Sequence, residues 1–132
     1  MIAIKEYPNL SINIKNQIIK NKLKIYELNH PNIAKVIYLS DDYEEKLNIV
    51  YEFLDKDNFE NIIKINGAFN DKILQLFAKQ LLQGLQYLHK NNIYHKNLKS
   101  NKIFIDSDGI IKIADSLIDS IILGDETKIY NY

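Results

Sequence analysis

The side chains of this chain that could do chemistry gather in residues 92–117, where charged and amide groups flank two short apolar runs. A carboxylate supplies the oxygen ligands that hard divalent cations prefer, and an ammonium group can neutralise the charge of a phosphate. An amide, by contrast, cannot act as a base at neutral pH. The side chains concerned are His95, Lys96, Asn97, Lys99 and Lys102 before the first run, and Asp115 after the second.

A hairpin is expected to hold these residues in place. The apolar runs are 103–105 and 110–114, and the pair Asp108-Gly109 lies between them. An Asp-Gly pair flanked by β-branched residues is a strong local signal for a tight turn that joins two antiparallel strands. The hairpin therefore leaves Asp115 at the end of its second strand.

Periodicity predicts the remaining elements as strands and amphipathic helices. Ser11 and Asn70 are expected N-caps, and Pro31 marks the end of the first helix because the residue before a proline disfavours helical geometry. We expect strands at 2–5, 33–39 and 47–54, an acidic turn at 41–45, and helices at 11–28, 59–65 and 71–90.

These motifs, in this order, resemble a eukaryotic serine/threonine protein kinase domain in a partial and degenerate form. Residues 95–102, H-K-N-L-K-S-N-K, take the place of the catalytic loop H-R-D-L-x-x-x-N, and D-S-L at 115–117 that of D-F-G. The strand I-A-I-K at 2–5 resembles the kinase V-A-I-K, and L-N-H-P-N-I at 28–33 resembles the phrase after helix αC. Residues 127–132 resemble the end of an activation segment.

The resemblance implies a fold of the α+β class, protein-kinase-like and truncated. It would consist of a small antiparallel sheet with an αC-like helix, a hinge, a long αE-like helix and the catalytic-loop hairpin. Residues 1–132 would form one partial domain, with 1–54 as the remnant of the small lobe and hinge, and 55–132 as the first part of the large lobe up to the activation segment. We expect the long helix to expose apolar faces that the missing helices of a complete domain would cover.

The resemblance also implies an ATP site. Lys5 would hold the phosphates, Tyr51 would be the gatekeeper, and Asp115 would bind Mg²⁺, although with weakened affinity. Asn97 stands at the degenerate position of the catalytic base, and Lys99 favours the serine/threonine branch of the family. The nucleotide-binding positions implied are Ala3, Lys5, Tyr51, Glu52, Phe53, Leu54, Lys102, Phe104 and Asp115.

Five departures from the family pattern argue against efficient catalysis. Asn97 replaces the aspartate that accepts the substrate proton, a loss that typically lowers the rate by on the order of 10²–10⁴. Lys102 replaces an asparagine that helps to hold a second Mg²⁺, so an oxygen ligand has become a cation. Asn21 replaces the glutamate that pairs with the strand lysine, and we expect it to be a solvated helix residue. Lys96 replaces an arginine, and Ser116-Leu117 replaces Phe-Gly.

Lys102 has two alternative placements. Its amine would either point towards Asp115 and replace the charge of one cation, permitting nucleotide binding with little Mg²⁺, or extend into solvent as most lysines do. The three histidines lack metal-ligand spacing. We therefore propose no metal site beyond Asp115.

Composition excludes several functional classes. Seventeen acidic and seventeen basic residues give a formal net charge of zero, which argues against a nucleic-acid or membrane surface. The chain has no cysteine, hence no disulfide and no thiolate metal site. No run is apolar enough for a signal peptide or a membrane span. We expect a cytoplasmic protein whose partner or substrate is another protein.

Two functions remain. The chain is either a pseudokinase that binds a nucleotide or a protein partner, or an ATP-dependent serine/threonine protein kinase that has weak activity or of which this sequence is an incomplete record. A decayed gene product without function is a third alternative. The sequence does not predict the oligomeric state.

Overall fold

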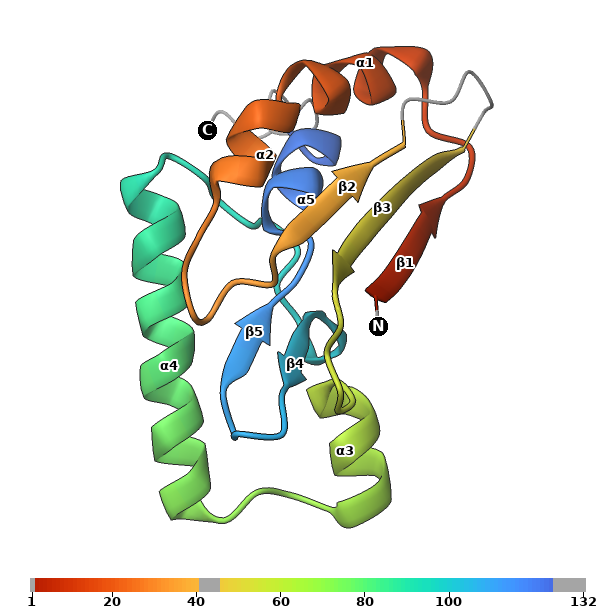
Figure 1. The fold of residues 1–132 in the computed structure, drawn as a ribbon. Helices are drawn as coiled ribbons and strands as arrows, with labels where there is room; N and C mark the ends of the chain where they lie inside the picture. Colours follow the sequence, from red (N-terminus) through yellow and green to blue (C-terminus); the bar gives the residue numbers. More distant parts are fainter. Residues whose placement is uncertain (1, 41–45, 125–132) are drawn as a thin grey trace, which may run out of the picture.

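The computed structural model describes residues 2–40 and 46–124, so the acidic turn at 41–45 and the motif at 127–132 lie outside the described residues. Figure 1 shows a small sheet beside the first helices, and a long helix beside a hairpin. The elements are β1 (Ile2–Tyr7), α1 (Ile12–Lys20), α2 (Lys22–Glu27), β2 (Val36–Leu39), β3 (Leu47–Glu52), α3 (Phe59–Asn66), α4 (Asp71–Lys90), a 3₁₀ turn η1 (Ser100–Lys102), β4 (Ile103–Ile105), β5 (Ile111–Ile113) and α5 (Ser116–Ile122).

The sheet presents its buried face to the site. Its strands are antiparallel in the order β1-β3-β2, and the register places Ala3 opposite Tyr51 and Lys5 opposite Ile49. Residues directly opposite one another project to the same side of a sheet. Because side chains alternate along a strand, Tyr7 shares this side with Lys5 and Tyr51.

The first helical segment breaks in two, so the expectation of one helix over 11–28 is wrong. α1 begins as predicted, because Ser11 Oγ accepts a hydrogen bond of 3.3 Å from the Ile14 amide. At Asn21 the backbone turns to φ −94° and ψ 8°, and the side-chain Nδ2 donates to the Gln17 carbonyl at 2.8 Å. An asparagine that bonds nearby backbone groups in this way competes with the helix. Asn21 is half-buried at the junction, and its side-chain hydrogen bond lies at the surface, so the expected contact with solvent is partly retained.

The strand limits also differ from those expected. β2 starts at Val36 because Ile33 forms an isolated parallel bridge with Ile113 of the hairpin. β3 ends at Glu52, two residues earlier than expected, and β1 runs on to Tyr7. Partners far away in the sequence set these limits, which local alternation of apolar residues cannot show.

The hairpin and its turn are confirmed. β4 and β5 pair with Ile103 opposite Ile113, and Gly109 adopts φ 76° in the turn. Asp106 stabilises the turn, because its Oδ1 accepts from the amides of Asp108 at 3.0 Å and Ile110 at 2.9 Å. A glycine is favoured at a positive φ because it has no Cβ to clash with the backbone.

A buried polar network joins α4 to the hairpin and to the loop before β2. Asn32 Nδ2 donates to Gln80 Oε1 and to the Ile111 carbonyl, both at 3.0 Å. Gly84 lets α4 approach closely, because a Cβ there would lie 3.1 Å from the Asn32 carbonyl oxygen and 3.0 Å from Ile113 Cδ1. These contacts fix the hairpin, and with it Asp115, against the long helix.

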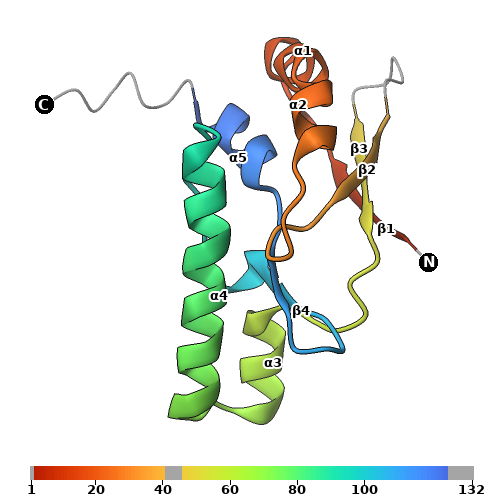
Figure 2. The same cartoon turned by 60° about the vertical axis from the view of Figure 1, so that its left-hand side comes forward.

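One side of α4 is exposed, as expected. The helix has the predicted bounds, and Asn70 Oδ1 caps it by accepting from the Ile73 amide at 3.0 Å. Figure 2 shows α4 on one side of the molecule and the sheet on the other, with the hairpin and α5 between them. In the described part of the chain, no helix is long and apolar enough to cross a membrane. The exposed apolar residues of α4 are Ile73, Leu74, Leu76 and Leu82.

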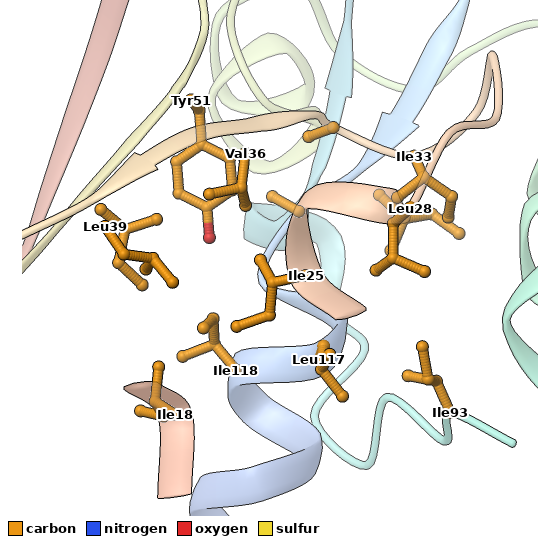
Figure 3. Close-up of a cluster of buried hydrophobic side chains, with 14 of the residues drawn as sticks. Ile18, Ile25, Leu28, Ile33, Val36, Leu39, Tyr51, Ile93, Leu117 and Ile118 are labelled. Atoms are coloured by element: carbon orange, nitrogen blue, oxygen red, sulfur yellow. The ribbon is translucent and has the colours of Figure 1, made fainter. Parts of the chain in front are cut away.

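A helix follows Asp115 directly, where the resemblance places the start of the activation segment. α5 packs against α1 and α2, and Leu117 and Ile118 turn towards Ile18, Ile25 and Leu28 in the core (Figure 3). The residual cavity beside them is only about 10 Å³, too little for more than one water. Leu117 and Ile118 thus fill the space between α5 and the α1–α2 pair.

Candidate functional site

Asp115 is the centre of the site. It follows β5 in a left-handed conformation, φ 61° and ψ 14°, and is only 3% exposed. Its Oδ2 accepts from Lys102 Nζ at 2.5 Å and from Lys5 Nζ, and its Oδ1 accepts from Tyr51 Oη at 2.6 Å. The placement of Lys102 towards Asp115 is confirmed, and the alternative of a solvent-directed lysine is wrong.

The charges of this cluster are strongly coupled. Burial alone would raise the pKa of Asp115, but the hydrogen bonds from Lys102 and Lys5 hold it at about 2. Burial would likewise lower the pKa of Lys102, yet its bonds to Asp115 raise it above the ordinary value. The pKa of Lys5 is lowered, by burial first and by the neighbouring Lys102 cation, against the attraction of Asp115. Asp115 is therefore ionised, and two ammonium groups share its Oδ2.

Tyrosines complete the surroundings of Lys5. The Lys5 ammonium lies 4.8 Å from the centre of the Tyr7 ring, and Tyr51 donates to the same carboxylate that Lys5 binds. Burial raises the pKa of both phenols well above the ordinary value, with the Asp115 charge as a further cause. The family pattern places a helix glutamate beside the strand lysine, at the position of Asn21. In this structure Asn21 donates to the Gln17 carbonyl, and Lys5 contacts Asp115 and Tyr7.

The catalytic-loop segment meets α5. His95 is buried, and its Nε2 lies 2.8 Å from the Ala114 carbonyl oxygen, which anchors the chain just before Asp115. Asn97 Nδ2 donates to Asp119 Oδ2 at 3.2 Å, and Lys102 Nζ lies 3.1 Å from the same oxygen. Lys96, with φ 62°, and Lys99 are exposed. Asn97, at the degenerate position of the catalytic base, therefore forms a hydrogen bond within the fold, to Asp119 of α5.

A cavity of about 490 Å³ opens beside Asp115, a size typical of small-molecule sites. Glu52, Phe53 and Lys102 do not line it, although they were named as nucleotide-binding positions. The Glu52 carboxylate accepts from Lys112 Nζ at 2.9 Å, Phe53 is exposed, and Lys102 Nζ contacts Asp115 and Asp119. The contacts expected of Glu52 and Phe53 are made by main-chain groups, which the placement of their side chains does not test. The lining residues are Ala3, Ile4, Lys5, Tyr51, Leu54, Asn58, Glu60, Asn101, Phe104, Ala114 and Asp115.

The donor set beside this cavity does not fit Mg²⁺. Hard divalent cations need several oxygen ligands, whereas both oxygens of Asp115 already accept hydrogen bonds from Lys5, Lys102 and Tyr51. Lys102 offers an ammonium group where the family pattern has an amide oxygen. Among the described residues, no three acidic, histidine or cysteine side chains lie close enough together to form a metal site. The expectation that Asp115 binds Mg²⁺ therefore lacks support from the geometry.

Comparison with known proteins identifies the family. The sequence model of the protein kinase domain matches residues 1–116. The chain belongs to the protein kinase domain family. It is 36% identical over 115 residues to the probable serine/threonine-protein kinase mkcB of Dictyostelium discoideum, a match that covers 87% of this chain and 16% of that protein. It is 37% identical over 100 residues to mitogen-activated protein kinase kinase kinase 3 of Arabidopsis thaliana, covering 75% of this chain and 14% of that protein.

A solved structure shows the same fold. The crystal structure of Rad53 in complex with AMP-PNP matches with a TM-score of 0.78 and 24% identity, over 89% of this chain and 31% of the Rad53 chain. The α+β kinase-like fold that the motifs implied is therefore confirmed for this chain. The chain spans only a minor part of the length of each of these kinase relatives.

Two residues of the cluster were not expected from the sequence. Tyr7 lies two residues after Lys5, so alternation along β1 could have placed both on one face. Asp119 lies four residues after Asp115, and this spacing places two residues on one face only if the segment is helical. The family pattern gave no reason to expect a helix there.

Proposed function

We propose that this member of the kinase family is a catalytically impaired, pseudokinase-like module that binds a nucleotide in the cavity beside Asp115. One observation carries the proposal. Both oxygens of Asp115 are engaged by Lys5, Lys102 and Tyr51, and Asn97, at the position of the base, donates to Asp119. Groups that would handle a metal and a proton in a catalytic kinase here serve as internal partners.

The charge distribution favours an anionic ligand at Lys5. Two ammonium groups converge on one carboxylate oxygen, and their repulsion contributes to the lowered pKa of Lys5. A phosphate placed at Lys5 would offset that repulsion. The Lys5 side chain is 40% exposed and lines the cavity, whereas the Lys102 side chain is 12% exposed. The phosphates of a nucleotide would therefore lie at Lys5, with its base among the apolar lining residues Ala3, Leu54 and Phe104.

Lys102 supports a finer proposal about the cation. Its ammonium lies 2.5 Å from Asp115, where a metal would otherwise neutralise the carboxylate. A fixed positive charge at this place would replace one cation, so nucleotide binding would need little or no Mg²⁺. The proposal concerns binding and assigns no catalytic step to Mg²⁺.

The test of binding is a thermal shift with ATP. A ligand present at about 100 times its dissociation constant should stabilise the protein by about 2.7 kcal/mol. We expect the parent protein to show the shift, Lys5→Ala to lose it, and Lys24→Ala, which removes an exposed lysine of α2 outside the cavity, to keep it. Each variant is compared with its own melting temperature without ATP. The absence of a shift in the parent, or an equal shift in Lys5→Ala, would contradict the proposal.

The alternative function is an ATP-dependent serine/threonine protein kinase of weak activity. It is supported by Lys5, His95, Lys99 and Asp115, which match the family motif. Positioning and charge stabilisation can leave a residual rate when the base is absent. A phosphate-transfer assay distinguishes the two functions.

The division of the chain is part of the proposal. Residues 1–54, with the sheet, α1 and α2, would correspond to part of a small lobe and hinge, and residues 55–132 to the first part of a large lobe. In either function the partner or substrate would be a protein. A cytoplasmic location stays a prediction from composition.

A further inference from the structure

Asp119 is a buried carboxylate that no kinase motif in this chain accounts for. It lies on α5 and is 4% exposed. Its Oδ2 is 3.1 Å from Lys102 Nζ, 3.2 Å from Asn97 Nδ2 and 3.9 Å from His95 Nδ1. All three neighbours belong to the segment that resembles the catalytic loop.

We propose that Asn97, Lys102 and Asp119 form a latch that holds α5 against the catalytic-loop segment, and that Asn97 and Lys102 are adapted to this latch. The inference does not depend on nucleotide binding. It gives two apparent losses of catalytic residues a structural role, because Asn97 and Lys102 are the donors that the buried carboxylate of Asp119 requires.

The polarity at position 97 matters because Asp119 needs a donor there. Asn97 is half-buried, so an aspartate in its place would put a second carboxylate about 3 Å from the buried Asp119, where each negative charge disfavours the ionised form of the other. The amide of Asn97 donates a hydrogen bond instead. The residue that a catalytic loop would need at this position is thus the one that α5 excludes.

The charge at position 102 matters because two buried carboxylates meet there. Lys102 Nζ contacts both Asp115 at 2.5 Å and Asp119 at 3.1 Å. A buried charge is tolerated only where it is paired. An asparagine at position 102 would leave Asp119 without an ammonium group, since Lys5 contacts Asp115, and the basic group nearest to Asp119 in the described cluster would be His95 Nδ1 at 3.9 Å.

The test is a double-mutant cycle followed by urea denaturation. We expect Asn97→Asp and Asp119→Asn each to move the unfolding midpoint to lower urea. The double variant should recover most of the loss caused by Asn97→Asp, because donor and acceptor have exchanged places and only one carboxylate remains. Asn16→Asp, on the exposed side of α1, is the matched control and should melt like the parent. Additive losses in the double variant, or an undisturbed Asn97→Asp, would overturn the latch.

Hydrogen exchange gives a second readout should Asn97→Asp fail to fold. Asn97→Ala removes the donor without adding a charge. Within α5 the amide of Asp119 bonds the Asp115 carbonyl at 2.8 Å, and that of Leu123 bonds the Asp119 carbonyl at 3.0 Å. We expect these two amides to exchange faster in Asn97→Ala, while the amides in the middle of α4 exchange as in the parent. Unchanged protection of α5 would contradict the proposal.

Discussion

Phosphate transfer from ATP to a peptide hydroxyl is expected to be about 10²–10⁴-fold slower in this protein than in a kinase with an aspartate at the position of Asn97. An amide cannot take up the substrate proton, and Asn97 here donates to Asp119. Transfer of labelled phosphate to a serine/threonine peptide measures the rate, with Asp115→Asn as the blank. A parent rate within about tenfold of the comparison kinase would contradict a catalytically impaired module.

Restoring the base alone should not restore the rate. In Asn97→Asp the new carboxylate meets Asp119, while Lys102 still engages Asp115. Only a variant that combines Asn97→Asp with Lys102→Asn and Asp119→Ala removes these internal partners. Full activity in Asn97→Asp alone would show that the surroundings of the base do not limit catalysis.

Truncation of Ile118 to alanine is expected to lower the free energy of unfolding by about 2–5 kcal/mol. The side chain is 1% exposed and packs in the core between α5 and the α1–α2 pair. The cavity there is very small, so the truncation would create a new void in a closely packed region. Chemical denaturation measures the change.

Ile12→Ala is the matched control for this truncation. It removes the same side chain at a position that is 74% exposed, so the free energy of unfolding should change by no more than about 0.5 kcal/mol. Equal effects of the two substitutions would mean that α5 does not pack as described.

Local signals predicted the parts of the fold that local interactions determine. The Asp-Gly turn of the hairpin, the asparagine cap of α4 and its bounds depend on neighbours within a few residues. The break at Asn21 escaped prediction because the apolar spacing continues across it. The limits of β2 escaped because Ile33 pairs with Ile113, which lies far along the chain.

The site was predictable as far as the family pattern extends. The motifs named Lys5, Tyr51, Lys102 and Asp115, and the structure brings these four together. The motifs did not predict the contacts of Asp119, because these contacts require helix α5. That helix is stabilised by the burial of Leu117 and Ile118 in a core assembled from distant segments. The contacts of Asp119 thus depend on packing that a sequence motif does not encode.

The replacement of a metal by Lys102 is tested most directly by titrating ATP into the protein in a calorimeter, once with Mg²⁺ and once with excess EDTA. We predict similar affinities under the two conditions for the parent, and a large loss of affinity in EDTA for Lys102→Asn. Binding that strictly requires Mg²⁺ in the parent and is unchanged by Lys102→Asn would contradict the account.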